Sequence, residues 1–256
     1  IAHVLLCFIE FFFLKKNSVL DNNIFTLSFK RIFDISSAGK KKIIRYGYNF
    51  FLWGIFGWGQ VFLDKYVLNH FTNTKLVGIY AVYYQYGFYP FTIFSTIISQ
   101  YLTPMFFDRV DDKSSILAFL KRLTLYNFGA LIILCPCLTL AAYYVAPYFI
   151  KLLTASIYLE YIKFFPIIVI GGFLYGLGQI LTVPLLNSDF VNKMRFPKIG
   201  STVLAVALFY ILIPRYQLMG ILLAIVLSNA FYFICLVIIN FMYVKQLTRK
   251  LSGRND

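Results

Sequence analysis

The feature that most constrains this sequence is the recurrence of apolar runs of about 20 residues, the length that a helix needs to cross a hydrocarbon layer roughly 30 Å thick. The chain has 256 residues, of which 60% are hydrophobic and 13% are charged, whereas soluble domains are about 25% charged. The runs lack the alternation of apolar and polar residues that the strands of a membrane barrel show, and a chain in lipid must satisfy its own backbone hydrogen bonds. The sequence therefore predicts an all-α integral membrane protein.

The apolar runs predict seven membrane spans. They are residues 1–14, 46–68, 76–107, 123–148, 164–187, 199–213 and 218–244. The first run opens the sequence without an initiator Met and is interpreted as the end of a transmembrane helix whose beginning is missing. The third is long and contains Pro90, which predicts a kink because proline removes a backbone hydrogen bond. We expect residues 15–45 to connect the first span to a lobe at 46–244, which residues 245–256 follow as a tail.

The formal charge of +14 predicts a topology rather than a nucleic-acid partner. Most Lys and Arg residues fall in segments 15–45, 108–122, 188–198 and the tail, on one side of the predicted spans. This distribution follows the positive-inside rule and predicts that the C-terminus is cytoplasmic. Segment 15–45 also has one apolar helical face, formed by Phe25, Phe29, Ile32 and Phe33 with Ser36. This face favours an amphipathic helix at the cytoplasmic membrane surface, with an ordinary loop as the alternative.

No arrangement of residues indicates catalysis, a metal or a cofactor. The cysteines at 7, 135, 137 and 235 lack the spacing of a metal or redox site. No acid near a span pairs with a His at a usable spacing, and no glycine-rich phosphate loop or nucleophile elbow occurs. The sequence therefore predicts that the protein is not an enzyme and has no cofactor.

The strongest site candidates, Asp64 and Gln60, lie in the stretch "WGIFGWGQVFLDK". Three- and four-residue steps place Trp53, Gly57, Gln60 and Asp64 on one helix face. Because this face is small and polar, we expect it to look into protein or a water-filled cavity and to line a substrate or ion pathway. In the alternative interpretation, Asp64 and Lys65 only mark the outer end of the helix, where Lys65 extends to the headgroups.

Two further patterns lie in later spans. Gln85 stands in the tyrosine-rich stretch "GIYAVYYQYGFYPF", and its amide is costly within a span unless it faces a partner or water. The tyrosines themselves favour a belt at the headgroup boundary, with stacking on sugars as the alternative. Gly172 and Gly176 have the small-xxx-small spacing that lets two helix backbones approach closely.

Three stretches together resemble the Wzx-type polysaccharide flippases, relatives of the multidrug exporters of the MATE type. "FLWGIFGWGQVFLDKYVLNHF" with "VGIYAVYYQYG" is similar to the family's seventh and eighth helices, and "SQYLTPMFF" fits the inner end of the eighth. "FYILIPRYQLMGILLAIVLS" is similar to the turn between the last two core helices, where Pro214, Arg215, Tyr216 and Gly220 match. Gln217 departs from the pattern, since the family usually has Gly there.

The resemblance implies a fold and an activity. The fold is the six-helix C-terminal lobe of a MATE-like transporter, preceded by the end of one transmembrane helix and facing a missing N-terminal lobe. The activity is movement of an undecaprenyl-diphosphate-linked oligosaccharide, such as an O-antigen or capsule unit, across the bacterial inner membrane by alternating access. Membrane lipids and other polysaccharide-assembly proteins are the further partners it implies.

The resemblance also suggests which residues take part. Asp64 and Lys65 match the family's acid–base pair, with Asp64 as the titrating group for any coupling ion, while Lys65, Arg109 and Arg122 are the available cations for a diphosphate. The alternatives are a membrane-embedded polysaccharide polymerase or ligase, which usually needs a large outer loop, and a cation-coupled small-molecule exporter.

Overall fold

The computed structural model describes residues 37–109, 112–186 and 191–252. Every regular element within these residues is helical, which confirms the all-α class. The chain divides into two units, Ile1–Gly47 and Tyr48–Asp256, and the following description concerns the second. The predicted span 1–14 and the amphipathic face at residues 25–36 lie outside the described residues.

The helices follow one another with short connections. In chain order they are α3 (Ser37–Phe71), α4 (Thr74–Tyr83), the π-helical turn η1 (Tyr84–Phe88), α5 (Tyr89–Phe107), α6 (Lys113–Leu153), the 3₁₀ turns η2 (Ser156–Leu159) and η3 (Ile162–Phe164), α7 (Phe165–Leu181), the 3₁₀ turn η4 (Val183–Leu186) and α8 (Val191–Leu251). The interruption expected near Pro90 takes the form of η1, which immediately precedes the first turn of α5.

Among the residues that the structure describes, three helical segments are long and apolar enough to cross a membrane, judged by length and composition. They are Lys113–Leu153, Ile162–Leu181 and Lys193–Arg249. The predicted spans from residue 46 onward all fall largely within helices, but their number of six stays a prediction. The chain is thus a helical membrane-type protein.

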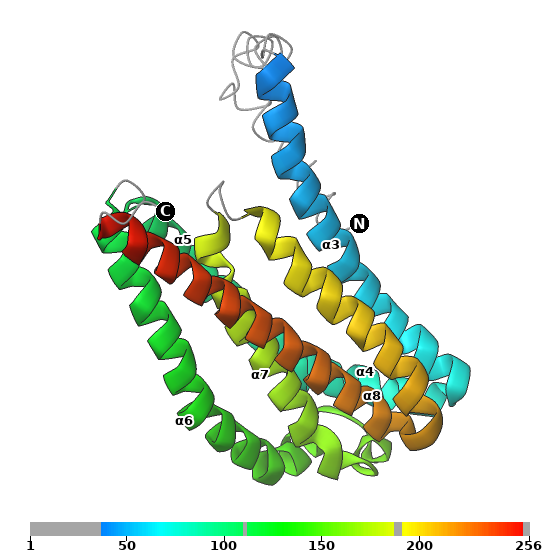
Figure 1. Ribbon diagram of the computed structural model, residues 1–256. Helices are drawn as coiled ribbons and strands as arrows, with labels where there is room; N and C mark the ends of the chain where they lie inside the picture. The colour runs from blue at the N-terminus through cyan, green and yellow to red at the C-terminus, as the bar shows by residue number, and fades with distance from the viewer. Residues whose placement is uncertain (1–36, 110–111, 187–190, 253–256) are drawn as a thin grey trace, which may run out of the picture. The chain divides into compact units, whose positions relative to one another are not determined.

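Helix α7 packs against α5, α6 and α8, as Figure 1 shows for α6 and α8 on its two sides. Its small residues permit this position: a Cβ added at Gly172 would lie 2.8 Å from the Cα of Phe88. One added at Gly176 would lie 3.2 Å from the carbonyl oxygen of Phe91. The expectation that Gly172 and Gly176 serve close helix packing therefore agrees with the structure.

Two asparagines of α8 bind the backbone of α7. Asn229 Nδ2 donates to the carbonyl oxygen of Gly171 at 3.2 Å, and Asn240 Nδ2 donates to that of Leu181 at 3.0 Å. Both amides are buried. In an apolar surrounding an amide needs such a partner, so these bonds fix the register of α8 against α7.

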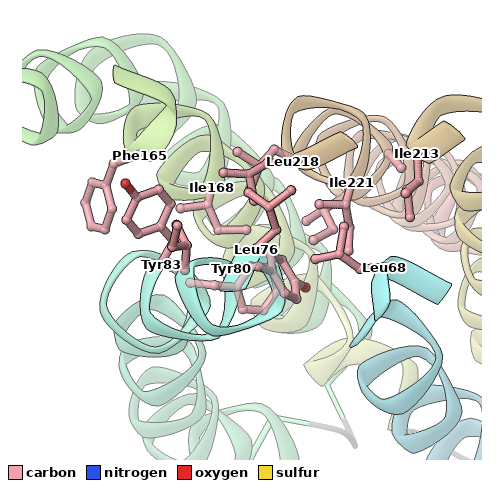
Figure 2. Packing of buried hydrophobic residues seen from close by; sticks show 14 of the residues in the cluster. Leu68, Leu76, Tyr80, Tyr83, Phe165, Ile168, Ile213, Leu218 and Ile221 are labelled. Carbon is pink, nitrogen blue, oxygen red and sulfur yellow. The ribbon is translucent and has the colours of Figure 1, made fainter. Parts of the chain in front are cut away.

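A core of tightly packed side chains lies where α3 ends and α4 begins, against α7 and α8 (Figure 2). Leu68, Tyr80 and Ile168 are fully buried in it. The phenol of Tyr83 donates to the carbonyl oxygen of Tyr158 at 2.7 Å, which holds the end of α4 against η2. Since lipid tails are as apolar as these side chains, the stabilisation comes from close packing rather than from removal from water.

Helix α8 breaks at Gln217 into two helices that run back along each other. Gln217 has φ 47° and ψ −121°, the only positive φ at a non-glycine residue in the described part of the chain. Behind the break, a Cβ at Gly220 would lie 2.4 Å from the carbonyl oxygen of Leu212, so only glycine fits there. The residue that departs from the flippase pattern therefore stands where the turn itself favours glycine.

Two basic connectors are shorter than the sequence predicts. Segment 108–122 was expected as a connection, but α6 already begins at Lys113, where the carboxylate of Asp112 accepts the backbone N–H groups of Ser114 and Ser115. Segment 188–198 is likewise helical from Val191. Charge and hydropathy mark where a span enters lipid, whereas capping decides where its helix begins.

Candidate functional site

A partly open cavity of about 130 Å³ lies between α3, α5, α7 and α8, beside the π turn η1. Its lining residues are Gly57, Gln60, Val61, Asp64, Tyr84, Phe88, Tyr89, Thr92, Tyr175, Lys198, Phe209, Ile225 and Asn229. The expected face of α3 thus borders a cavity through Gly57, Gln60 and Asp64. The hydroxyl of Thr92 in the wall is buried and has no hydrogen-bond partner among the described residues. The cavity thus combines a mainly apolar wall with a few polar groups that can bind water or the polar part of a ligand.

Lys198 brings an amino group into this cavity. Its side chain is 3% exposed, and its Nζ lies 5.1 Å from the ring centre of Tyr175, 5.7 Å from that of Tyr232 and 6.0 Å from that of Trp53. These ring faces attract a cation. Within the part of the chain that the structure describes, no carboxylate lies within ion-pair distance of Lys198. The amino group is therefore held by aromatic rings and remains available to an anion.

The surroundings of Lys198 hold its side chain in one place. Nζ donates to Gln60 Oε1 at 3.4 Å, and the hydroxyl of Thr202 lies at the same distance from that oxygen. The absence of a side chain at Gly57 makes room, since a Cβ there would lie 3.2 Å from Lys198 Cε. Gly57 and Gln60 thus act together as the α3 side of a lysine site.

Asp64 lines the same cavity about one helical turn beyond Gln60 on α3. Its side chain is 3% exposed; Oδ2 accepts the phenol of Tyr80 at 2.5 Å and Oδ1 accepts the backbone N–H of Lys65 at 2.5 Å. These bonds fix the carboxyl group without neutralising it by a cation. The cavity therefore contains one acidic and one basic side chain, each held by neutral partners.

The other predicted residues lie elsewhere. Lys65 does not extend freely outward: it is half-buried, with Nζ 5.6 Å from the ring centre of Tyr84. Gln85 is exposed and does not line the cavity. Arg109 and Arg122 line a separate groove at the other end of α5, remote in sequence from Asp64. Of the four site candidates, the structure brings together Gln60 and Asp64. The pathway role assigned to all four stays a prediction.

The residue that sequence reasoning missed is Lys198, which was assigned to a cytoplasmic connector. Its signal was present in the periodicity, because Lys198, Ser201 and Thr202 follow each other at helical spacing and are all buried. A single lysine beside a predicted span is usually interfacial, so the pattern alone did not separate this one from the basic connectors.

Near the start of α4, an ion pair joins this helix to the connection between α6 and α7. Lys75 Nζ lies 2.5 Å from Glu160 Oε2, with about half of each side chain exposed. This hydrogen bond raises the pKa of Lys75 and lowers that of Glu160. The pair ties the start of α4 to the segment between η2 and η3, while the bond from Tyr83 to Tyr158 holds the end of α4 against η2.

The comparison with protein families gives one finding that bears on these residues. A family model described as "Polysaccharide biosynthesis protein" matches residues 17–163, which is more than half of the chain. The matched range contains α3 to α6 and therefore the Gln60 and Asp64 side of the cavity. No curated protein and no solved structure matched the sequence.

Proposed function

This chain belongs to the polysaccharide biosynthesis protein family, and we propose that it is the C-terminal lobe of a flippase for lipid-linked oligosaccharides. The substrate is an undecaprenyl-diphosphate-linked repeat unit, moved from the inner to the outer leaflet of the bacterial cytoplasmic membrane. The missing N-terminal lobe supplies the other wall of the passage, and the C-terminus is cytoplasmic. The observation that carries the proposal is the cavity with the buried amino group of Lys198.

The physical demand on such a protein supports this role for the cavity. A diphosphate and sugar hydroxyls cannot cross the hydrocarbon layer without replacement hydrogen bonds and countercharge. Lys198, Gln60 and Thr92 offer these groups, while the polyprenyl tail stays in lipid. About 130 Å³ is below the roughly 300 Å³ of small-molecule sites. The cavity therefore receives the charged end of the substrate, and the oligosaccharide occupies space between the two lobes.

The proposal is tested by disrupting the full-length gene in its host and locating the lipid-linked sugar units. We expect them to accumulate on the cytoplasmic leaflet, out of reach of a membrane-impermeant lectin applied to spheroplasts. Complementation with Lys198→Gln should restore about a tenth of wild-type delivery or less, because one charge-assisted contact is lost. Lys198→Arg, which keeps the charge, should restore more.

The matched control is Lys245→Gln, which removes the same charge from an exposed position in the second part of α8. It should complement like the wild type. Protein amount and thermal stability in detergent are measured for each variant to separate function from folding. Normal outer-leaflet delivery in the disrupted strain would refute the flippase, whereas a folded and fully active Lys198→Gln variant would refute only the role of the cavity.

A second function, cation-coupled export of a small molecule, is favoured by the buried carboxyl group of Asp64. Carboxyl groups inside membrane proteins commonly bind or relay cations. In proteoliposomes of the full-length protein, this function predicts export of a cationic dye driven by a proton or sodium gradient and lost in Asp64→Asn. Gradient-independent movement of a lipid-linked sugar, without dye export, would exclude it.

A further inference from the structure

A second hollow lies away from the cavity, where α5 ends and α6 begins. This groove has a volume of about 380 Å³ and shares no lining residue with the cavity. It is lined by Leu102 and Met105 of α5, by Arg109 in the turn just after α5, and by Ser115, Ala118, Phe119, Arg122, Leu123 and Tyr126 of α6. In both helices these positions repeat at three- and four-residue steps, so the groove is formed by one face of each.

Two guanidinium groups supply the polar part of the groove. Arg109 Nη1 donates to the carbonyl oxygen of Met105 at 2.5 Å, and the guanidinium carbon lies 6.0 Å from the ring centre of Phe119. Arg122 is exposed. Neither arginine has an ion-pair partner among the residues that the structure describes. A guanidinium has five N–H donors in a planar fork, so both groups retain donors for a phosphate.

The carboxylate of Asp112, just before α6, is bound to other groups. Asp112 accepts the N–H and hydroxyl groups of Ser114 and Ser115 at the start of the helix. These bonds lower the pKa of Asp112 to about 2. Asp112 therefore serves as the cap of α6, and the charged side chains among the described residues that line the groove are the two arginines.

The walls of the groove continue into uncovered apolar surface. Tyr101 on α5 and Leu125 on α6 are each 69% exposed, and Ile132 farther along α6 is 71% exposed. No residue in the most apolar stretch of α6 is buried by other parts of the described chain. Figure 1 shows α6 at the edge of the bundle, as expected for a helix that borders lipid. A ligand held by the two arginines would thus have apolar surface directly beside it.

We propose that this groove binds an anionic phospholipid, with its phosphate between Arg109 and Arg122 and its acyl chains along α5 and α6. Basic pockets between membrane helices bind such headgroups at the cytoplasmic side, where anionic lipids concentrate. Tyr126, one turn beyond Arg122, suits the boundary between headgroups and chains. The bound lipid fills the space between the ends of α5 and α6.

The test measures phospholipid retained by the purified full-length protein after exchange into mixed micelles of phosphatidylglycerol and phosphatidylcholine. The wild type should retain phosphatidylglycerol in preference. Arg109→Gln with Arg122→Gln should lower that retention by about tenfold or more, as expected for two cationic contacts at a membrane surface. The matched control, Lys113→Gln with Lys121→Gln, removes the same charge from exposed positions of α6 outside the groove and should change retention less than about twofold.

A third variant tests the groove without changing charge. Ala118→Trp fills it from an exposed position and should also release phosphatidylglycerol. Equal losses in the two charge-removal variants would overturn the proposal in favour of general surface charge. Retention of phospholipid without preference for phosphatidylglycerol would also overturn it. If only an undecaprenyl diphosphate displaced phosphatidylglycerol, the groove would be a substrate site and the proposal would be wrong.

Discussion

Replacing Gln217 by glycine should stabilise the protein. At φ 47° and ψ −121° the backbone occupies a region that glycine adopts freely and that a Cβ makes unfavourable. A non-glycine residue in such a region costs about 1–3 kcal/mol. Glycine gives back roughly 0.5–1 kcal/mol because it has more freedom in the unfolded chain. With midpoints of about 2 and about 0.75 kcal/mol for these two effects, the net gain in the free energy of unfolding is about 1 kcal/mol.

The gain is measurable by thermal unfolding of the purified protein in detergent. For a chain of this size, 1 kcal/mol shifts the melting temperature by about 2–4 °C, so Gln217→Gly should raise it by about that amount. Gln217→Ala is the control, since it removes the exposed side chain but keeps the Cβ and the strain. An equal rise in both variants would show that the side chain, rather than the backbone, is responsible, and no rise in Gln217→Gly would refute the strain itself.

Three other changes follow from the same structure. Gly220→Ala places a Cβ 2.4 Å from the carbonyl oxygen of Leu212 and should cost about 3 kcal/mol, seen as a lower melting temperature; an unchanged value would contradict the close approach of the two helices. Asn240→Leu removes the hydrogen bond to Leu181 and should lower the free energy of unfolding by about 1 kcal/mol. Backbone amide hydrogens at the end of α7 should then exchange faster with solvent. Faster exchange confined to α8 would argue against the bond. The pKa of Asp112 is lowered, so its charged cap stabilises α6 above about pH 4 and loses that effect as the pH falls toward 2. The difference in melting temperature between wild type and Asp112→Asn should therefore shrink over that interval. A constant difference would show that the charge is irrelevant.

The sequence was most informative where a regular helix carries a face of distinctive residues. Gly57, Gln60 and Asp64 lie on one face of α3, and three- and four-residue steps were enough to predict that this face meets a cavity. Gln85 was predicted from the cost of an amide within a span rather than from such steps; it lies in the π turn η1, exposed and outside the cavity lining, and its pathway role stays a prediction. A wider turn of this kind leaves no mark in the periodicity of side chains.

Lys198 could not be predicted as a site residue because its partners come from other helices. Tyr175, Tyr232 and Trp53 stand around it only after α3, α7 and α8 have packed. For Gln217, the sequence comparison with the resembled family already marked the position as one that usually holds glycine. Only the dihedral angles show that the turn keeps a conformation suited to glycine.

The glycine contacts of α7 limit how this half of the protein can deform. The backbone of α7 at Gly172 lies against that of Phe88, and the side-chain amides of Asn229 and Asn240 donate hydrogen bonds to it. Helix α7 therefore cannot slide past α5 or the second part of α8 without losing several contacts at once. We therefore expect α5, α7 and the second part of α8 to move together in any rearrangement of this half of the protein.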